Sequence, residues 1–116
     1  MLSTTTFSRG DIILVSFPFT DLTSTKRRPA LVLSPDSFNA LKQDLILAPI
    51  TSKLVPDVHA IVLEDHDFKD GRLPKRSQVK LTKVFTIHSA LVVKRICGLK
   101  PEKMNLVLES VRTFYS

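Results

Sequence analysis

The chain has 116 residues, 43% of them hydrophobic and 24% charged, which is typical of a globular domain long enough to bury a core without disulfides or a structural metal. Lys and Arg outnumber Asp and Glu by a net charge of +6, which favours a polyanionic partner. We expect one cytoplasmic domain over residues 1–116 with no membrane partner, because Met1–Phe7 lacks the parts of a signal peptide and no apolar run approaches the ~20 residues of a membrane span.

Asp11–Phe19 predicts the first strand, because its residues are mostly β-branched or aromatic and follow a glycine. The next segment, Thr20–Arg28, is polar and rich in turn-forming residues, which predicts a loop. A second strand is expected at Ala30–Leu33, where an apolar run begins and then ends at Ser34-Pro35. The residues just before this run therefore lie at the mouth of a strand.

Asp36–Gln43 predicts a short helical turn with Asp36 as its N-cap. Leu45–Ile50 is apolar throughout and bounded by polar residues, a pattern typical of a strand buried on both faces. A fourth strand is expected at Val58–Leu63, followed by a turn-rich loop at Glu64–Pro74.

The last third of the chain predicts two strands and a helix. Residues 78–82 alternate polar and apolar side chains, which predicts a half-buried strand. Its shared polar face holds Gln78, Lys80 and Thr82. Val92–Cys97 is expected to be the last strand, ended at Gly98, and Pro101 suits the first turn of a helix whose apolar residues recur at helical spacing. Five or six short strands with a terminal helix indicate a mainly β fold, built as a small, strongly bent antiparallel sheet or barrel.

The charges are unevenly distributed along the chain. Residues 57–70 contain five acids against one lysine, whereas residues 72–83 contain five bases and no acid. Further bases lie at Lys26–Arg28 and Lys94-Arg95. Basic clusters of this kind form either a solvated surface or a polyanion-binding face. We favour the polyanion-binding face.

Two short motifs are candidates for binding a phosphate. Arg27-Arg28-Pro29 places two permanent cations beside a proline that stiffens the backbone, and the arginine fork suits bidentate contact with a phosphate. Thr51-Ser52 places two hydroxyls at the end of the next predicted strand, where one can hydrogen-bond a phosphoryl oxygen. The same residues also fit solvated loop charges and a strand-end cap, so the motifs alone leave both interpretations open.

Other chemically active residues fit structural roles better. Glu64-Asp65-His66-Asp67 matches neither zinc nor calcium spacing, so we interpret it as an acidic surface loop and expect no metal and no cofactor. Cys97 lies among apolar residues and is expected in the core. His59 lies within a predicted strand, and His88 is expected to cap a turn.

Five motifs occur in a fixed order along the chain. They are Arg9-Gly10-Asp11-Ile12, Arg27-Arg28-Pro29-Ala30-Leu31-Val32-Leu33-Ser34, Ile50-Thr51-Ser52, Gln78-Val79-Lys80-Leu81 and Phe85-Thr86-Ile87. In this order and spacing, over nearly its whole length, the chain resembles the MazF/PemK family, the toxins of bacterial toxin–antitoxin pairs. The resemblance implies an SH3-like β-barrel with a C-terminal helix, usually a homodimer. It also implies metal-independent cleavage of single-stranded RNA, restrained by a partner antitoxin.

The resemblance assigns roles to individual residues. The key arginine of the family's Arg-Pro motif corresponds to Arg28, its threonine at the end of the third strand to Thr51, and a glutamine near the site to Gln78. The chain departs from the family in two places. Residues 20–27 contain no glycine, and Lys75-Arg76-Ser77 lacks the acid that some members place before the glutamine.

These roles fit RNA cleavage by the RNA's own 2′-hydroxyl, which leaves a 2′,3′-cyclic phosphate and a 5′-hydroxyl. Arg28 is expected to stabilise charge on the phosphorane and Thr51 to hold a non-bridging oxygen, while the general base is open between His88 and Asp21. The residues expected to contact RNA are Lys26, Arg27, Ser52, Lys75, Arg76, Gln78 and Lys80. Because few aromatic residues are free to stack on bases, specificity is expected to come mainly from hydrogen bonds to the bases.

Two alternative functions involve no RNA cleavage. One is a non-catalytic barrel that binds protein or nucleic acid, as the gyrase-poisoning toxins of this fold do. The other is a degenerate member that retains only antitoxin binding. A shared fold by itself does not separate them from a nuclease.

Overall fold

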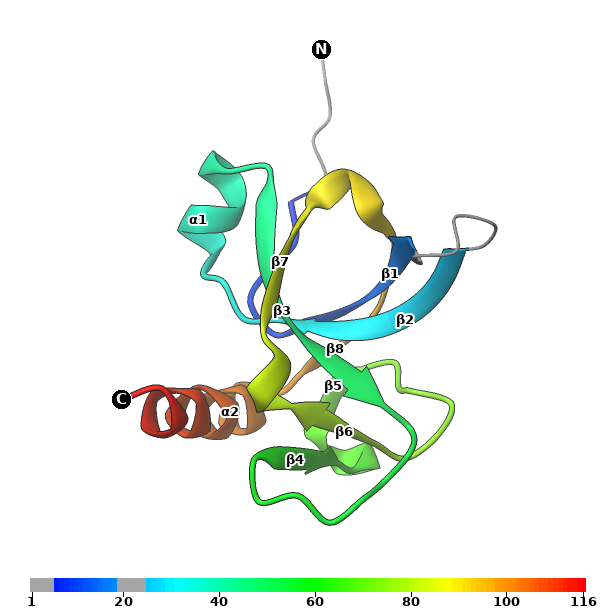
Figure 1. Ribbon diagram of the computed structural model, residues 1–116, viewed down its shortest axis with the longest axis vertical. Coiled ribbons are helices and arrows are strands. Elements are labelled where there is room, and N and C mark those ends of the chain that lie inside the picture. The colour runs from blue at the N-terminus through cyan, green and yellow to red at the C-terminus, as the bar shows by residue number, and fades with distance from the viewer. Residues whose placement is uncertain (1–5, 19–24) are drawn as a thin grey trace.

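The strands form one strongly curled antiparallel sheet, with the longer helix at one end of it (Figure 1). The computed structural model describes residues 6–18 and 25–116. In chain order its elements are β1 (Asp11–Pro18), β2 (Thr25–Val32), α1 (Asp36–Leu41), β3 (Asp44–Thr51), β4 (Ala60–Leu63), η1 (Asp65–Asp67), β5 (Phe68–Asp70), β6 (Ser77–Lys80), η2 (Leu81–Lys83), β7 (Phe85–His88), η3 (Ser89–Leu91), β8 (Val92–Leu99) and α2 (Pro101–Phe114).

The order of strands in the sheet is β4-β6-β3-β2-β1-β8-β5, and β7 also pairs with β3. Every pair is antiparallel. The curled sheet with its C-terminal helix confirms the predicted mainly β, SH3-like barrel.

The central strands bury both of their faces, because successive side chains of a strand point to opposite sides. In β3, Leu45 and Leu47 belong to an apolar cluster shared with β1, β2 and β7. Ala48 and Ile50, on the other face, belong to a second cluster that reaches Met104 and Val107 of α2, among others. The predicted doubly buried strand is therefore confirmed.

Strand β2 begins at Thr25, well before the predicted start at Ala30. Its first half pairs with β1, including Val15 with Arg28 and Ser16 with Arg27. The turn propensity of these polar residues is overridden because the ladder with β1 satisfies their backbone groups. The prediction of a loop at residues 25–28 is therefore wrong; residues 19–24 lie outside the described residues.

Two short strands were not predicted from the sequence. Strand β5 lies inside the segment Glu64–Pro74 that was expected to be a loop, and β7 follows η2. They have three and four residues, too few for a strand period to stand out from a turn. Their place in the sheet is decided by their partners, β8 and β3.

Several predicted boundaries also shift. The strand expected at Gln78–Thr82 ends at Lys80, because the chain enters η2, and Thr82 is not in a strand. The N-cap of α1 is Pro35 rather than Asp36, whose carboxylate instead accepts a hydrogen bond from the backbone of Arg9 at 2.8 Å. Strand β8 continues through Gly98 to Leu99.

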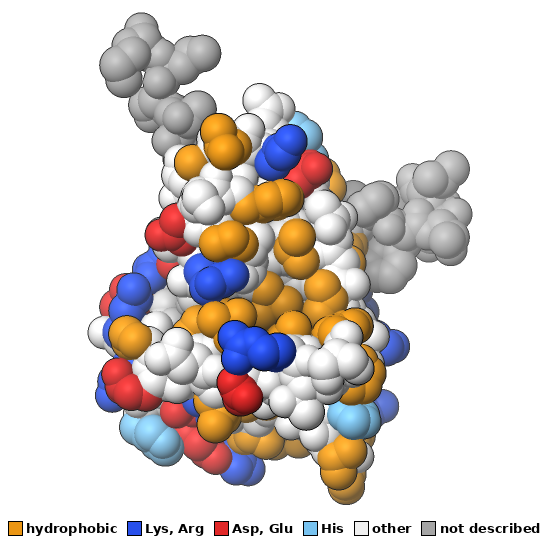
Figure 2. Space-filling model, turned by 90° about the vertical axis from the view of Figure 1, so that its left-hand side faces the viewer, with side chains coloured by type: hydrophobic (Ala, Val, Ile, Leu, Met, Phe, Trp, Pro, Cys, Tyr) orange, Lys and Arg blue, Asp and Glu red, His pale blue; other side chains and the backbone are white. Residues whose placement is uncertain are grey.

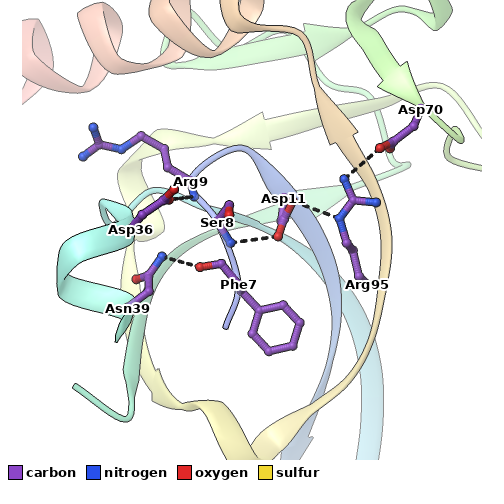
Figure 3. Close-up of polar contacts among 8 residues, drawn as sticks. All are labelled: Phe7, Ser8, Arg9, Asp11, Asp36, Asn39, Asp70 and Arg95. Carbon is purple, nitrogen blue, oxygen red and sulfur yellow. Dashed lines mark hydrogen bonds and ion pairs between the residues drawn. The ribbon is translucent and has the colours of Figure 1, made fainter. Parts of the chain in front are cut away.

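Polar contacts tie the start of β1 to β8, β5 and α1 (Figure 3). Arg95 donates from Nε to Asp11 Oδ1 at 2.9 Å and from Nη2 to Asp70 Oδ2 at 3.0 Å. Asn39 Nδ2 donates to the carbonyl oxygen of Phe7 at 2.8 Å. One guanidinium thus connects three neighbouring strands.

Asp67 anchors the acidic segment to α2. Its carboxylate accepts hydrogen bonds from Glu64 N at 2.7 Å and Lys103 Nζ at 3.2 Å, and its carbonyl accepts one from Lys100 N at 2.8 Å. Burial raises the pKa of Asp67, but the hydrogen bonds from Glu64 and Lys103 outweigh burial and the pKa falls below its ordinary value. The predicted acidic surface loop is therefore wrong for Asp67, which is only 6% exposed.

Hydrophobic side chains gather across one face of the molecule, the left-hand side of Figure 1 (Figure 2). Exposed apolar residues on the helices include Leu41 of α1 and Leu106 of α2. Within the described residues, no helix combines the length and the apolar character needed to cross a bilayer.

We predict that Asp67→Asn lowers the free energy of unfolding by about 1–3 kcal/mol at pH 7, because a buried charged acceptor is lost. Urea denaturation measures this value. Asp65→Asn, at an exposed neighbour, is the control and should change it by less than about 0.5 kcal/mol.

The loss should depend on pH in one direction. Since the pKa of Asp67 is lowered on folding, its stabilisation is present above the ordinary value of 3.8 and is lost as pH falls below it. The gap between wild type and Asp67→Asn should therefore be constant from pH 5 to pH 7 and shrink below about pH 4. If the difference in unfolding free energy between wild type and Asp67→Asn instead grows as pH falls, the ionised Asp67 carboxylate does not stabilise the fold.

Candidate phosphate-binding site

A pocket lies where β2 and β3 separate. The two strands pair from Val32 and Leu47 to Ala30 and Pro49, and beyond that pair they diverge (Figure 1). The pocket between them has a volume of about 290 Å³ and is called the Arg28–Thr51 pocket. Its lining residues are Arg27, Arg28, Pro29, Ile50, Thr51, Ser52, Leu73, Pro74, Lys75 and Ser77.

The strand register decides which of these side chains share a face. Arg27 and Arg28 leave β2 in opposite directions, since side chains alternate along a strand. The β2–β3 pairing ends at Ala30 and Pro49, so Arg28 and Thr51 are not paired but line the same pocket across the opening between the two strands. Thr51 pairs with Gln78 of β6.

The charge at the pocket is positive. Arg27, Arg28 and Lys75 line it, and none of its lining residues is acidic. In the part of the chain that the structure describes, these three cations form no salt bridge. Uncompensated cations beside hydroxyl donors are suited to a phosphate group.

Thr51 presents a hydroxyl whose proton is available. The backbone N of Lys53 donates a hydrogen bond to Thr51 Oγ1 at 3.1 Å. A hydroxyl has one donor and two acceptor positions, so this contact leaves the proton free for an oxygen of a bound group. The contact also orients Oγ1 at the end of β3.

Gln78 is buried, whereas a half-buried strand would leave it facing solvent. It is 2% exposed because it is flanked by Thr51 on β3 and Val62 on β4. Its Nε2 has no hydrogen-bond partner in the described structure. A buried donor without a partner costs about 1–3 kcal/mol. Such a group, placed beside Thr51, is typical of a functional site.

The other predicted binding residues divide between the pocket and its surroundings. Those that line it are Arg27, Ser52 and Lys75. Those outside its lining are Lys26, Arg76, Gln78 and Lys80. Sequence reasoning missed Leu73-Pro74, in the segment between β5 and β6, and Ser77, the first residue of β6, which also line the pocket. No motif marks this segment as a wall, because only folding brings it opposite β2.

The other reactive side chains lie away from the pocket or are inert. His88 accepts a hydrogen bond from Ala90 N through Nδ1 at 2.9 Å, which confirms the predicted cap and places it outside the pocket lining. Asp21, the other candidate base, lies outside the described residues. Cys97 is in the core as predicted, and burial raises the pKa of its thiol to about 11, so it stays protonated at neutral pH.

Comparison with known proteins identifies one family and its fold. The family model that matches residues 8–115 is described as PemK-like, MazF-like toxin of type II toxin–antitoxin system. Among curated proteins, no sequence matches the chain.

Solved structures share the fold at low sequence identity. MazE–MazF (Form-III) from Deinococcus radiodurans has a TM-score of 0.79 at 17% identity, over 96% of this chain and 97% of that one. An endoribonuclease in complex with its cognate antitoxin from Mycobacterial species has a TM-score of 0.74 at 14% identity, over 95% and 93%. The Mycobacterium tuberculosis toxin MazF-mt6 has a TM-score of 0.72 at 18% identity, over 90% and 95%.

We predict that Gln78→Met leaves the free energy of unfolding unchanged or raises it by about 1 kcal/mol, because it removes an unpaired buried donor. Chemical denaturation measures the change. The matched control is Gln43→Met, at an exposed glutamine, expected within about 0.5 kcal/mol of wild type. A loss above about 1 kcal/mol for Gln78→Met would mean that the protein itself satisfies Nε2.

Proposed function

Because the chain belongs to the PemK-like, MazF-like toxins of type II toxin–antitoxin systems, we propose that it is an endoribonuclease that cleaves single-stranded RNA without a metal ion. The observation that carries the proposal is the pocket that Arg28 and Thr51 share, which is lined by three cations and no acid. Two similar structures are of endoribonucleases, one of them with its cognate antitoxin.

The proposed reaction is attack of an RNA 2′-hydroxyl on the adjacent phosphorus. The bond to the 5′-oxygen breaks, and the products are a 2′,3′-cyclic phosphate and a 5′-hydroxyl. Negative charge grows on the non-bridging oxygens during the attack, so groups that bind those oxygens lower the barrier.

Arg28 and Thr51 supply such groups. Arg28 is exposed at the pocket and offers fixed positive charge and several N–H donors to the phosphorane. The available proton of Thr51 Oγ1 is donated to a non-bridging oxygen. A guanidinium stays protonated at neutral pH, so the role of Arg28 is electrostatic rather than as a base.

Gln78 lies behind Thr51 in the β3–β6 ladder. Because its unpaired Nε2 is buried and Gln78 does not line the pocket, we assign it a positioning role through Thr51 rather than contact with the phosphate. Since no carboxylate or imidazole belongs to the described pocket lining, we assign no general base.

The remaining cations hold the RNA backbone. Lys75 and Arg27 line the same pocket as Ser52, and Lys26 and Lys80 extend the basic surface along β2 and β6. Contacts of this kind bind phosphates without reading sequence, and they weaken as salt concentration rises.

The proposed partners are an antitoxin protein and a second copy of the chain. Two of the similar structures are MazE–MazF complexes, and a third is an endoribonuclease with its antitoxin. By analogy with these complexes, we propose that a cognate antitoxin neutralises this chain. The homodimer is proposed because the family resemblance of the sequence implies it.

We predict that the purified protein cuts a long single-stranded RNA in EDTA and leaves 5′-hydroxyl ends. Arg28→Ala and Thr51→Ala should each lower the cleavage rate by at least about 100-fold, because each removes a stabiliser of the transition state. End mapping identifies the products, and thermal denaturation checks that both variants fold.

Arg112→Ala is the control, since Arg112 is an exposed arginine on α2 outside the pocket lining, and it should cut at the wild-type rate. Intact RNA with the wild-type protein would rule out the nuclease. RNA binding without cleavage would favour a non-catalytic barrel. Cleavage that needs added Mg²⁺ would contradict the metal-free reaction.

A further inference from the structure

A second cleft adjoins the Arg28–Thr51 pocket. It has a volume of about 760 Å³ and is called the Glu64–Arg76 cleft. Its lining residues are Leu63, Glu64, Asp65, His66, Phe68, Arg72, Leu73, Pro74, Lys75 and Arg76. Leu73, Pro74 and Lys75 line both spaces, so one short segment separates them.

The cleft has an apolar floor and a polar rim. Leu63, Phe68 and Leu73 are buried members of the main core cluster, and parts of them form its lining. The rim carries charged side chains of both signs. Because the three apolar side chains are nearly buried, the polar rim supplies most of the groups that can contact and orient a bound molecule.

The rim is organised by one ion pair. Arg76 donates from Nε to Glu64 Oε1 at 3.1 Å and from Nη2 to Glu64 Oε2 at 2.6 Å. Hydrogen bonding by Arg76 holds the pKa of Glu64 below its ordinary value, so the carboxylate is ionised at neutral pH. Each carboxylate oxygen keeps a lone pair, and the guanidinium keeps further N–H groups, for a bound molecule.

This pairing distinguishes Arg76 from the other cations of the cleft. Glu64 compensates the charge of Arg76, whereas Arg72 and Lys75 in the same lining form no salt bridge in the described structure and remain available to the RNA backbone. A carboxylate accepts from the exocyclic amino group of a base, while a guanidinium donates to ring nitrogens and carbonyls. At position 4 cytosine carries an amino group and uracil a carbonyl oxygen, and a carboxylate accepts from the first and repels the second.

We propose that the Glu64–Arg76 cleft is a nucleobase subsite that selects bases with an exocyclic amino group over uracil. The proposal rests on the proposed function, because the neighbouring pocket then holds the phosphate of the same RNA. Glu64 is the specificity-determining residue, and Arg76 both positions it and donates to the base. In single-stranded RNA, base edges are free for such contacts.

The test compares binding of two decamers, 2′-O-methyl cytidine and 2′-O-methyl uridine, which the protein cannot cleave by 2′-hydroxyl attack. Fluorescence anisotropy at one fixed salt concentration gives both Kd values for each protein. The wild type should bind the cytidine decamer about tenfold more tightly than the uridine decamer. In Glu64→Gln the ratio should fall close to one, with uridine binding unchanged or tighter, because a negative charge has been removed.

Two further variants separate the possible causes. Glu64→Asp keeps the negative charge, but its shorter side chain moves the carboxylate away from the base. This variant should therefore also lose most of the preference for the cytidine decamer. Glu109→Gln is the matched control, because Glu109 forms a similar exposed pair with Arg112 at 2.7 Å on α2, and it should keep the wild-type ratio.

Three results would overturn the subsite: equal wild-type affinity for the two decamers, a preference that persists in Glu64→Gln and Glu64→Asp, or binding of neither decamer. If the cleft instead binds a partner protein, one of these three results is expected. The test also separates the subsite from the nuclease activity. If the base preference depends on Glu64 but long RNA is not cleaved, the nucleobase subsite stands and only the cleavage reaction is ruled out.

Discussion

Strand β3 is shared by three ladders, and the rest of the sheet depends on its position. Its residues pair in turn with β7, β2 and β6. Leu45 and Leu47 fill one apolar cluster, and Ala48 and Ile50 fill the other. A slip of one residue would exchange the two faces, so burial on both sides fixes the register. The register of β3 therefore places Thr51 at the end of the strand, opposite Gln78.

The opening beside Thr51 follows from the same pairing. Strand β2 remains paired with β1 as far back as Thr25, whereas the end of β3 turns to pair with β6. The two strands therefore part after Ala30 and Pro49, and Arg28 lies at the opening. The divergence of two strands of the sheet therefore opens the pocket that the cation and the hydroxyl share.

The two neighbouring clefts differ mainly in how their charges are compensated. Cations at the Arg28–Thr51 pocket have no acidic neighbour in its lining, whereas Arg76 is neutralised by Glu64 in the adjoining cleft. An RNA strand offers a charged backbone and neutral bases, so the two environments match two parts of one polymer. The wall between them continues into β6, whose buried Gln78 pairs with Thr51.

The sequence by itself determined the mainly β class, the doubly buried strand at Leu45–Ile50 and the helix after Pro101, because these depend on periodicity and local capping. The order of its motifs also indicated Arg28 and Thr51. Only the tertiary structure decided that Lys26–Arg28 lie in a strand, that Gln78 is buried with an unpaired amide, and that Arg76 is bound to Glu64. The physical reason is that pairing and burial of these side chains depend on residues far away in the chain, which no local pattern records.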